Sequence, residues 1–404
     1  MSRTVPTRSR LPGLIWILGV VSLCMDTSSE LVHALLPIYM TTVLGAGMVT
    51  VGVIEGVAEA TASIVKVFSG SLSDAVGSRK WLVVAGYGLA ALTKPVFPLA
   101  ASVSWVFGAR FVDRVGKGIR GAPRDALVAD VVPAHMRGAA YGLRQSMDSI
   151  GAFLGPLLAL LAMGWFAGDI RAVLWLATVP ATLAVLLLVA CVREPARVRG
   201  ASTAAPRRPL SLAAARELPR RYWHIVALGV VFALARFSEA FLVLRAQDAG
   251  LPIAQVPAVM ILMNVIYAGV AYPAGHAADT MSARTLLVAG LAVLVAADVA
   301  LAVATAPWFV FVGTAAWGAH LGLSQGLFSK LVADTAPAHA RGTAFGVFNL
   351  VNGMAMLLAS VIAGLMWSAA GPGATFAVGG GFALVAIVGL LAATPSRRGD
   401  ARPA

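Results

Sequence analysis

The chain has 404 residues, of which 59% are hydrophobic and 12% charged, and its mean hydropathy is +0.84. Soluble proteins carry roughly 25% charged residues, so this composition excludes an ordinary soluble fold and makes the lipid bilayer part of the solvent. The net charge of +13 does not indicate nucleic-acid binding, because the basic residues gather in short connections between apolar segments, which is the positive-inside pattern.

Twelve apolar segments predict membrane-spanning helices, since a span needs about 20 apolar residues at about 1.5 Å rise per residue. Alternate connections between them are basic, together with both termini, and the remaining connections are nearly uncharged, so we expect both termini in the cytoplasm. The first segment follows basic residues but lacks a cleavage site, which predicts an uncleaved span rather than a signal peptide. The segments cover residues 12–39, 48–72, 80–101, 104–127, 138–164, 170–192, 222–246, 253–277, 283–305, 307–331, 342–367 and 373–394.

No motif in the chain indicates catalysis or cofactor binding. Cys24 and Cys191 lie far apart in apolar segments and predict neither a disulfide framework nor a metal site. The six histidines are scattered, and the run 116–118 lacks the pattern of a phosphate-binding loop. We therefore expect no enzyme activity, no metal and no cofactor.

A repeated loop divides the chain into two halves. GSLSDAVGSRK at residues 70–80 returns in degraded form as GHAADTMSAR at residues 275–284, and ALVADVVPAHMRGAAYG at 126–142 matches KLVADTAPAHARGTAFG at 330–346. The predicted domains are a six-helix bundle at 1–192, a basic cytoplasmic linker at 193–221, a second six-helix bundle at 222–394 and a cytoplasmic tail at 395–404. The linker contains eight arginines, which predict an anchor to anionic lipid headgroups or, alternatively, a regulatory or partner-binding segment.

The first copy of the loop resembles the signature of the major facilitator superfamily. Gly70, Asp74, Gly77, Arg79 and Lys80 stand at the signature positions, with Ser78 in place of the usual arginine. The resemblance extends along the whole chain. It implies an all-α membrane protein of the major facilitator fold, with twelve transmembrane helices in two six-helix repeats that work by alternating access.

Two further motifs resemble signatures of the family, and the second is that of bacterial twelve-helix drug or metabolite–proton antiporters. In the span 104–127, Arg114, Lys117 and Gly118 match the second family signature, with Lys117 where glutamine is common. In the span 138–164, the antiporter signature is matched by Gly142, Gly151, Gly155 and Pro156. Leu157-Leu158-Ala159 replaces the glycines that normally end this signature. The same small residues and proline are also the pattern of plain helix packing.

The resemblance implies a latch at the cytoplasmic side. Asp74 would contact the start of the span 342–367 when the cavity faces outward, where a helix N-terminus favours negative charge. Arg79 and Lys80 would lie at the headgroups. The second copy keeps Gly275, Asp279 and Arg284. The alternative is that these charges only set the topology.

Charged residues inside the spans are costly, so each is expected to be paired or functional. Asp113 with Lys117, and Arg144 with Asp148, are four residues apart and predict intrahelical pairs. These pairs would be structural. The resemblance implies that the spans 12–39, 104–127, 222–246 and 307–331 line the cavity.

Carboxylates in that cavity are the candidates for proton coupling. Desolvation and a nearby arginine act on such a carboxylate in opposite directions, so it can bind and release a proton as the cavity alternates. Asp26 and Glu30, four residues apart on one helical face, are the first candidates, followed by Glu59 and Asp148.

The polar and aromatic residues within the spans of the second half are mostly neutral, which suits substrate contact better than proton coupling. Helix packing and interhelical hydrogen bonds are the alternative role for these residues. The substrate-cavity candidates of both halves are Arg110, Arg114, Arg236, Glu239, Asn264, Tyr267, Trp317, His320 and Gln325.

These observations predict a secondary active transporter of a bacterial inner membrane that exports a small molecule in exchange for protons. The expected partners are the substrate, protons and the bilayer, with no nucleic acid, and we expect a monomer. Proton-coupled uptake is an alternative, because buried carboxylates serve either direction. A sensor or complex subunit built on a transporter scaffold is an alternative of another class. The basic span 104–127 favours an anionic or zwitterionic substrate.

The asymmetry between the two loop copies yields a first prediction. The first copy retains Gly77, whereas Met281 and Ser282 occupy the corresponding region of the second. We therefore expect Asp74→Asn to impair transport more than Asp279→Asn, measured as transport rate at matched expression. Equal losses in the two variants would contradict this ranking.

Overall fold

The computed structural model describes residues 11–76, 78–133, 136–192, 218–324, 327–337 and 340–392, without the side chains of residues 71, 74–76, 279, 329 and 341. Gly77, Gln325, the linker as far as residue 217 and the tail 395–404 lie outside the described residues, as do the side chains of Asp74 and Asp279. The described part is helical and contains no strand, which confirms the predicted all-α class.

The helices of the first half follow the predicted segments closely. Proline interrupts one of them, because Pro95, which has no N–H to donate, separates α3 from α4. The elements are α1 (Gly13–Ile38), the π-helical turn η1 (Tyr39–Val43), α2 (Met48–Val76), α3 (Arg79–Thr93), α4 (Val96–Leu99), α5 (Val103–Val131), α6 (Arg137–Trp165), α7 (Ile170–Leu176) and α8 (Thr178–Cys191).

The second half has the same order of segments but one deeper break. The predicted span 222–246 is divided between α10 and α11 by the non-helical residues around Arg236, Phe237 and Ser238. The elements are α10 (Arg220–Leu234), α11 (Ala240–Asp248), the short 3-10 turn η3 (Ile253–Gln255), α12 (Pro257–Thr280), α13 (Ala283–Ala302), α14 (Pro307–Ser324), α15 (Leu327–Thr335), α16 (Arg341–Ala370) and α17 (Pro372–Ala392).

Nine helical segments of the described chain are long and apolar enough to cross a membrane. The predicted spans at α5, at α10 with α11 and at α14 with α15 are not among the nine. The charged residues of α5 and the break between α10 and α11 account for two of these cases. The structure thus establishes a multi-pass helical membrane protein, while the count of twelve spans and the cytoplasmic position of the termini stay predictions.

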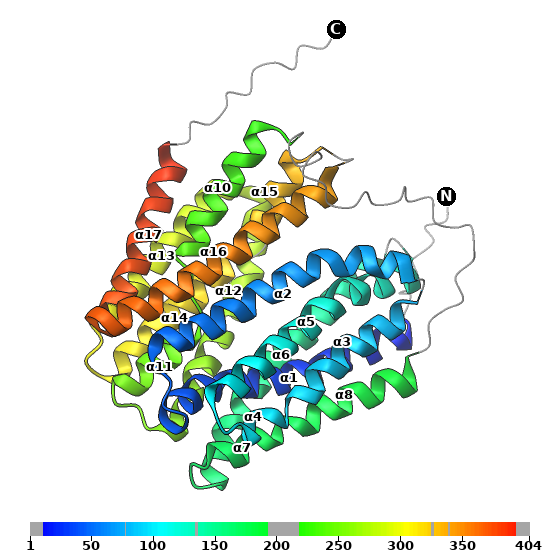
Figure 1. Cartoon of the computed structure of the whole chain (residues 1–404). Coiled ribbons are helices and arrows are strands. Elements are labelled where there is room, and N and C mark those ends of the chain that lie inside the picture. The colour runs from blue at the N-terminus through cyan, green and yellow to red at the C-terminus, as the bar shows by residue number, and fades with distance from the viewer. Residues whose placement is uncertain are drawn as a thin grey trace, which may run out of the picture.

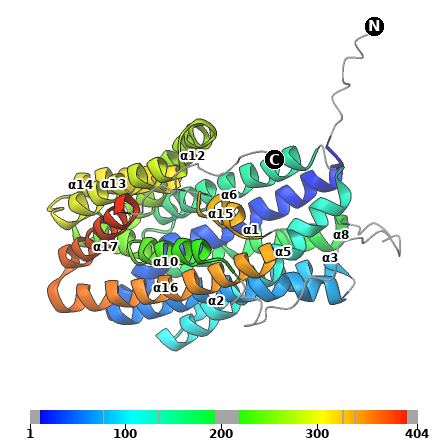
Figure 2. The same cartoon turned by 90° about the horizontal axis from the view of Figure 1, so that it is seen from above.

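The helices α1–α8 and α10–α17 form two groups that lie side by side (Figures 1 and 2). Within the first group α1 packs on α6 and α3 on α5, and within the second α13 packs on α14 and α17. Contact between the groups runs chiefly along α2 and α16, with α6 against α12 and α1 against α11. The predicted domains and their boundaries stay predictions.

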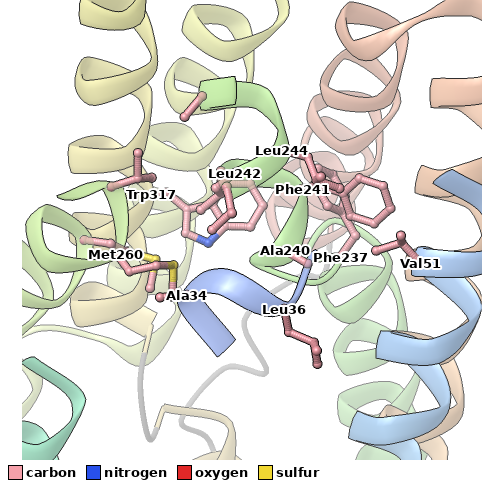
Figure 3. Close-up of a cluster of buried hydrophobic side chains, with 14 of the residues drawn as sticks. Ala34, Leu36, Val51, Phe237, Ala240, Phe241, Leu242, Leu244, Met260 and Trp317 are labelled. Carbon is pink, nitrogen blue, oxygen red and sulfur yellow. The ribbon is translucent and has the colours of Figure 1, made fainter. Parts of the chain in front are cut away.

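One end of the contact between the groups is sealed by apolar side chains. We call it the distal end, because α1 ends there. The opposite end, where α1 begins and where α8 and α17 end, is called the terminal end. Figure 3 shows Leu36 of α1 and Val51 of α2 near Phe237 and Phe241 of the second group. The ring of Phe237 lies 5.4 Å from that of Trp317 and 5.6 Å from that of Phe241, between ring centroids. This distal seal excludes water from one end of the space between the groups.

Glycines bring α2 and α16 into close contact at the same end. A β-carbon added to Gly52 would lie 2.2 Å from the backbone oxygen of Ser360, and one added to Gly364 would lie 2.5 Å from the backbone oxygen of Met48. Small residues of this kind let membrane helices approach closely. The distal seal therefore depends on the absence of side chains at these positions.

We predict that Gly52→Ala opens or destabilises the distal seal. The new methyl group would overlap the backbone of α16, and overpacking of this kind costs roughly 1–3 kcal/mol. The thermal midpoint of the purified protein should fall. Gly108→Ala is the matched control, because Gly108 in α5 has no heavy atom near the added β-carbon. Equal thermal midpoints in the two variants would disprove the role assigned to this contact.

Candidate functional site: a charged cavity between the helix groups

A cavity of about 500 Å³ lies between the two helix groups. Both groups contribute to its wall, and its first-group residues come from the middle of α1 and from the middle and terminal-end halves of α2, α5 and α6. The distal seal lies on its other side. Its charged lining residues are Asp26, Glu30, Glu59, Lys66, Lys117, Arg120, Arg124, Asp148, Arg236 and Glu239.

Close packing of α1 on α6 places two of the lining carboxylates. A β-carbon added to Gly151 would lie 2.7 Å from the backbone oxygen of Leu23, and one added to Gly155 would lie 2.6 Å from that of Thr27. The face of α1 that carries Asp26 and Glu30 thus lies directly against α6. Gly142, the first glycine of the same motif, has no heavy atom within 4 Å of an added β-carbon.

Each lining carboxylate of the first group has a basic partner. Asp26 lies 3.6 Å from Arg120 and Glu59 lies 3.3 Å from Arg114. Glu30 is paired with a histidine, His33, at 3.4 Å. The pairs of Asp26 and Glu59 connect α1 and α2 with α5, whereas that of Glu30 lies within α1. About a quarter of the Asp26 and Glu30 side chains is exposed at the cavity surface (24% and 23%).

Asp148 shares two arginines. Its carboxylate lies 3.2 Å from Arg144, the partner predicted four residues away on α6, and 3.8 Å from Arg124 of α5. The intrahelical pair is therefore confirmed, but it is part of an interhelical network. Asp125 also belongs to it, at 3.5 Å from Arg144.

Four other lining charges have no ion-pair partner within the part of the chain that the structure describes: Lys66, Lys117, Arg236 and Glu239. The predicted pair of Asp113 with Lys117 is wrong. Asp113 instead bonds to Lys94 at 2.8 Å. The reason is that α3 packs tightly on α5, with Gly86 against Gly116, and so brings Lys94 to the buried face that carries Asp113.

Two predicted cavity residues lie behind the wall. Arg110 is 1% exposed and donates to Glu55 at 2.7 Å, and His33 lies 3.8 Å from the same carboxylate. Arg114 is held between Glu59 and Asp113 and is likewise buried. Gly118 faces Val65 of α2, since an added β-carbon would lie 2.6 Å away.

The second group contributes Arg236, Glu239, Asn264 and Tyr267 to the cavity. The amide of Asn264 also donates to the backbone oxygen of Ala152 in α6, at 3.0 Å, and so bridges the two groups. The other candidates on this side, Trp317 and His320, do not line it. Trp317 belongs to the distal seal, and His320 is hydrogen-bonded to the backbone oxygen of Gly290 at 2.7 Å.

The two copies of the repeated loop make equivalent contacts at the terminal end. Lys80 donates to the backbone oxygen of Val189 at 3.0 Å, and Arg284 donates to that of Leu391 at 2.6 Å. Each cation thus reaches the last turn of the final helix in its half, α8 or α17, where cations are favourable. Arg79 pairs with Asp130 of α5 at 2.8 Å. The latch assigned to Asp74 stays a prediction, as its side chain is not described.

Sequence reasoning did not place among the candidates the cavity-lining cations Lys66, Arg120 and Arg124, nor the buried groups His33 and Asp298. His33 is three residues from Glu30, and this spacing signals a pair on one helical face. Asp298 in α13 is 1% exposed, and neither of its carboxylate oxygens has a hydrogen-bond partner among the described residues. Its position as a carboxylate in the apolar middle of the span 283–305 could have identified it.

Comparisons with known proteins agree with this architecture. The sequence profile of the Major Facilitator Superfamily matches residues 18–271 and 240–404. An uncharacterised MFS-type transporter of Methanocaldococcus jannaschii is 30% identical over 381 residues, which are 92% of each chain. A crystal structure of the nucleoside transporter NupG has a TM-score of 0.74 at 13% identity, covering 94% of this chain and 98% of that one. A D-xylose–proton symporter has a TM-score of 0.71 at 16% identity, covering 96% and 98%.

The fold and the cavity between two helix groups define a membrane transport protein. The chain belongs to the Major Facilitator Superfamily.

The buried pair of Arg110 and Glu55 yields a stability prediction. Removing one partner leaves an uncompensated buried charge, which costs about 3–5 kcal/mol. Glu55→Gln should therefore lower the thermal midpoint substantially. Glu239→Gln is the matched control, because Glu239 has no ion-pair partner in the described structure and should change little. A thermal midpoint of Glu55→Gln as high as that of the control would refute the structural role of the pair.

Proposed function

We propose that this protein is a proton-coupled exporter of a small molecule in a bacterial inner membrane. The observation that carries the proposal is a cavity between the helix groups in which several carboxylates each face a basic side chain. Ionisable groups within membrane spans are costly and are retained where they serve ion pathways or pairs. A carboxylate that exchanges a proton for an arginine contact can couple proton movement to substrate movement.

The distal seal supports an alternating-access mechanism. In this conformation the cavity is closed at the distal end by apolar contacts between the two groups, whereas its charged wall extends along the terminal-end halves of α2, α5 and α6. The opposite conformation would require α2 and α16 to separate at Gly52 and Gly364. The close backbone contacts at these glycines contain no ion pair. They can therefore part and re-form without leaving a buried charge unpaired.

Asp26 and Glu30 are the residues that we propose as proton carriers. Both are partly exposed to the cavity, and their partners are held loosely, by an Arg120 contact of 3.6 Å and a histidine contact of 3.4 Å. Glu59 follows, because its 3.3 Å contact with Arg114 keeps it closer to a permanent cation. Asp148 shares Arg124 and Arg144 and so faces two permanent cations.

Export is proposed because the motif on α6 resembles the antiporter signature. Uptake by proton symport is the second candidate, and the fold accommodates it, since one structure of this fold is a D-xylose–proton symporter. The two directions differ in which way substrate moves when a proton gradient is applied. A sensor or complex subunit would show no substrate movement at all.

We predict that Asp26→Asn and Glu30→Gln abolish coupling but not substrate exchange. In proteoliposomes, either variant should lose the component of substrate movement that is driven by a pH gradient, while counterflow of labelled against unlabelled substrate persists. Neutral side chains of the same shape leave the binding site in place but cannot carry a proton. Glu59→Gln should have a smaller effect on the driven component.

The wild type provides the control for coupling. Collapse of the gradient with a protonophore should abolish its gradient-driven net transport and leave counterflow unchanged. Undiminished net transport after collapse would refute proton coupling. Loss of counterflow together with coupling in both variants would show that Asp26 and Glu30 act in binding and not in proton transfer.

A further inference from the structure

More of the cations than of the carboxylates that line the cavity lack an ion-pair partner among the described residues. Five acidic and five basic side chains line it. Four of the acidic ones have a basic partner, whereas three of the basic ones, Lys66, Lys117 and Arg236, have no acidic partner in the described structure. A ligand that enters the cavity therefore meets three available cations and one available carboxylate, that of Glu239.

Lys117 is the most informative of these cations. It lies in the middle of α5, and its side chain is exposed to the cavity. The carboxylate four residues before it, Asp113, is engaged with Lys94. The carboxylates that share the cavity wall with it, Asp26, Glu30 and Glu59, each have another basic partner. A lysine within a membrane span and without a partner is costly, and a bound anion would compensate it.

Arg236 offers a second cation from the opposite helix group. On a continuous helix, Arg236 and Glu239 would be three residues apart and would pair. The break between α10 and α11 removes that geometry, and the two side chains form no ion pair. Both remain available at the cavity wall. Guanidinium groups are well suited to bind carboxylate or phosphate with two hydrogen bonds.

We infer that the transported substrate is an amphipathic organic anion, with a carboxylate or phosphate group bound between Lys117 and Arg236. Its apolar part would lie on Met263, Tyr267 and Leu321, which line the same cavity from the second group. An anion held by one cation from each group would draw the groups together, as alternating access requires. The inference rests on the proposed transport function and names its substrate class.

Binding to the purified full-length protein tests this substrate class. The probes are four molecules with the same apolar body: phenylbutyrate, phenylbutyl phosphate, phenylbutanol and phenylbutylammonium. At constant ionic strength, the two anions should raise the thermal midpoint with saturable dependence on concentration, and the alcohol and the ammonium should not. Lys117→Gln and Arg236→Gln should each weaken anion binding at least tenfold.

Two further variants keep the outcome interpretable. Lys117→Arg preserves the charge and should retain anion binding, which separates loss of charge from loss of folding. Glu239→Gln removes the available carboxylate, which would repel an anion, and so should not weaken anion binding. Stabilisation by the ammonium probe that disappears in Glu239→Gln would overturn the inference. So would anion binding that is unchanged in Lys117→Gln and Arg236→Gln, or the absence of stabilisation by either anion.

The binding experiment requires no proton gradient, so its result is separate from that of the transport experiments. Anion binding without gradient-driven movement would leave the substrate class intact and refute proton-coupled export. Gradient-driven export of a cationic compound would do the reverse.

Discussion

Neutralisation of charge inside the helix bundle is the constraint on which this structure depends. A side chain such as Arg110 cannot lie 1% exposed among membrane helices unless a carboxylate accompanies it, and Glu55 does so at 2.7 Å. The pair of Lys94 and Asp113 satisfies the same requirement between α3 and α5. These pairs join α5 to α2 and to the end of α3, and so contribute to how the three helices of the first group pack together.

The same constraint divides the charges into two kinds. The pairs of Arg110 with Glu55 and of Lys94 with Asp113 lie behind the cavity wall at 2.7 and 2.8 Å and serve packing. The carboxylates on the wall are paired at 3.2 Å or more or, like Glu239, have no partner among the described residues. Asp26 and Glu30 belong to the loosely paired kind, and Lys117 and Arg236 to the kind without one. A transporter needs this division, because only a charge whose partner can be exchanged can respond to a proton or to a substrate.

Glycines supply the second physical element. Gly151 and Gly155 hold α1 against α6 within one group, whereas Gly52 and Gly364 hold α2 against α16 between the groups. The first contact orients the carboxylates of α1, and the second closes the distal end. Because contacts of this kind rest on close backbone approach and not on buried ion pairs, the contact between groups can break without exposing an unpaired charge.

The sequence by itself determined the membrane class, the helical segments, the repeat and the set of charged positions, since hydropathy, loop charge and spacing are local properties. It identified Asp26, Glu30, Lys117 and Arg236, but it paired Asp113 with Lys117 because spacing reports only neighbours on one helix. Only the tertiary structure decided that Lys94 forms the ion pair with Asp113 and that Arg110 lies behind the cavity wall. It also placed Trp317 in the distal seal and left Asp298 without a hydrogen-bond partner among the described residues. Helix-to-helix contacts decide which charges form ion pairs and which remain available. These contacts join residues on different helices and are set by packing, so spacing along one helix does not report them.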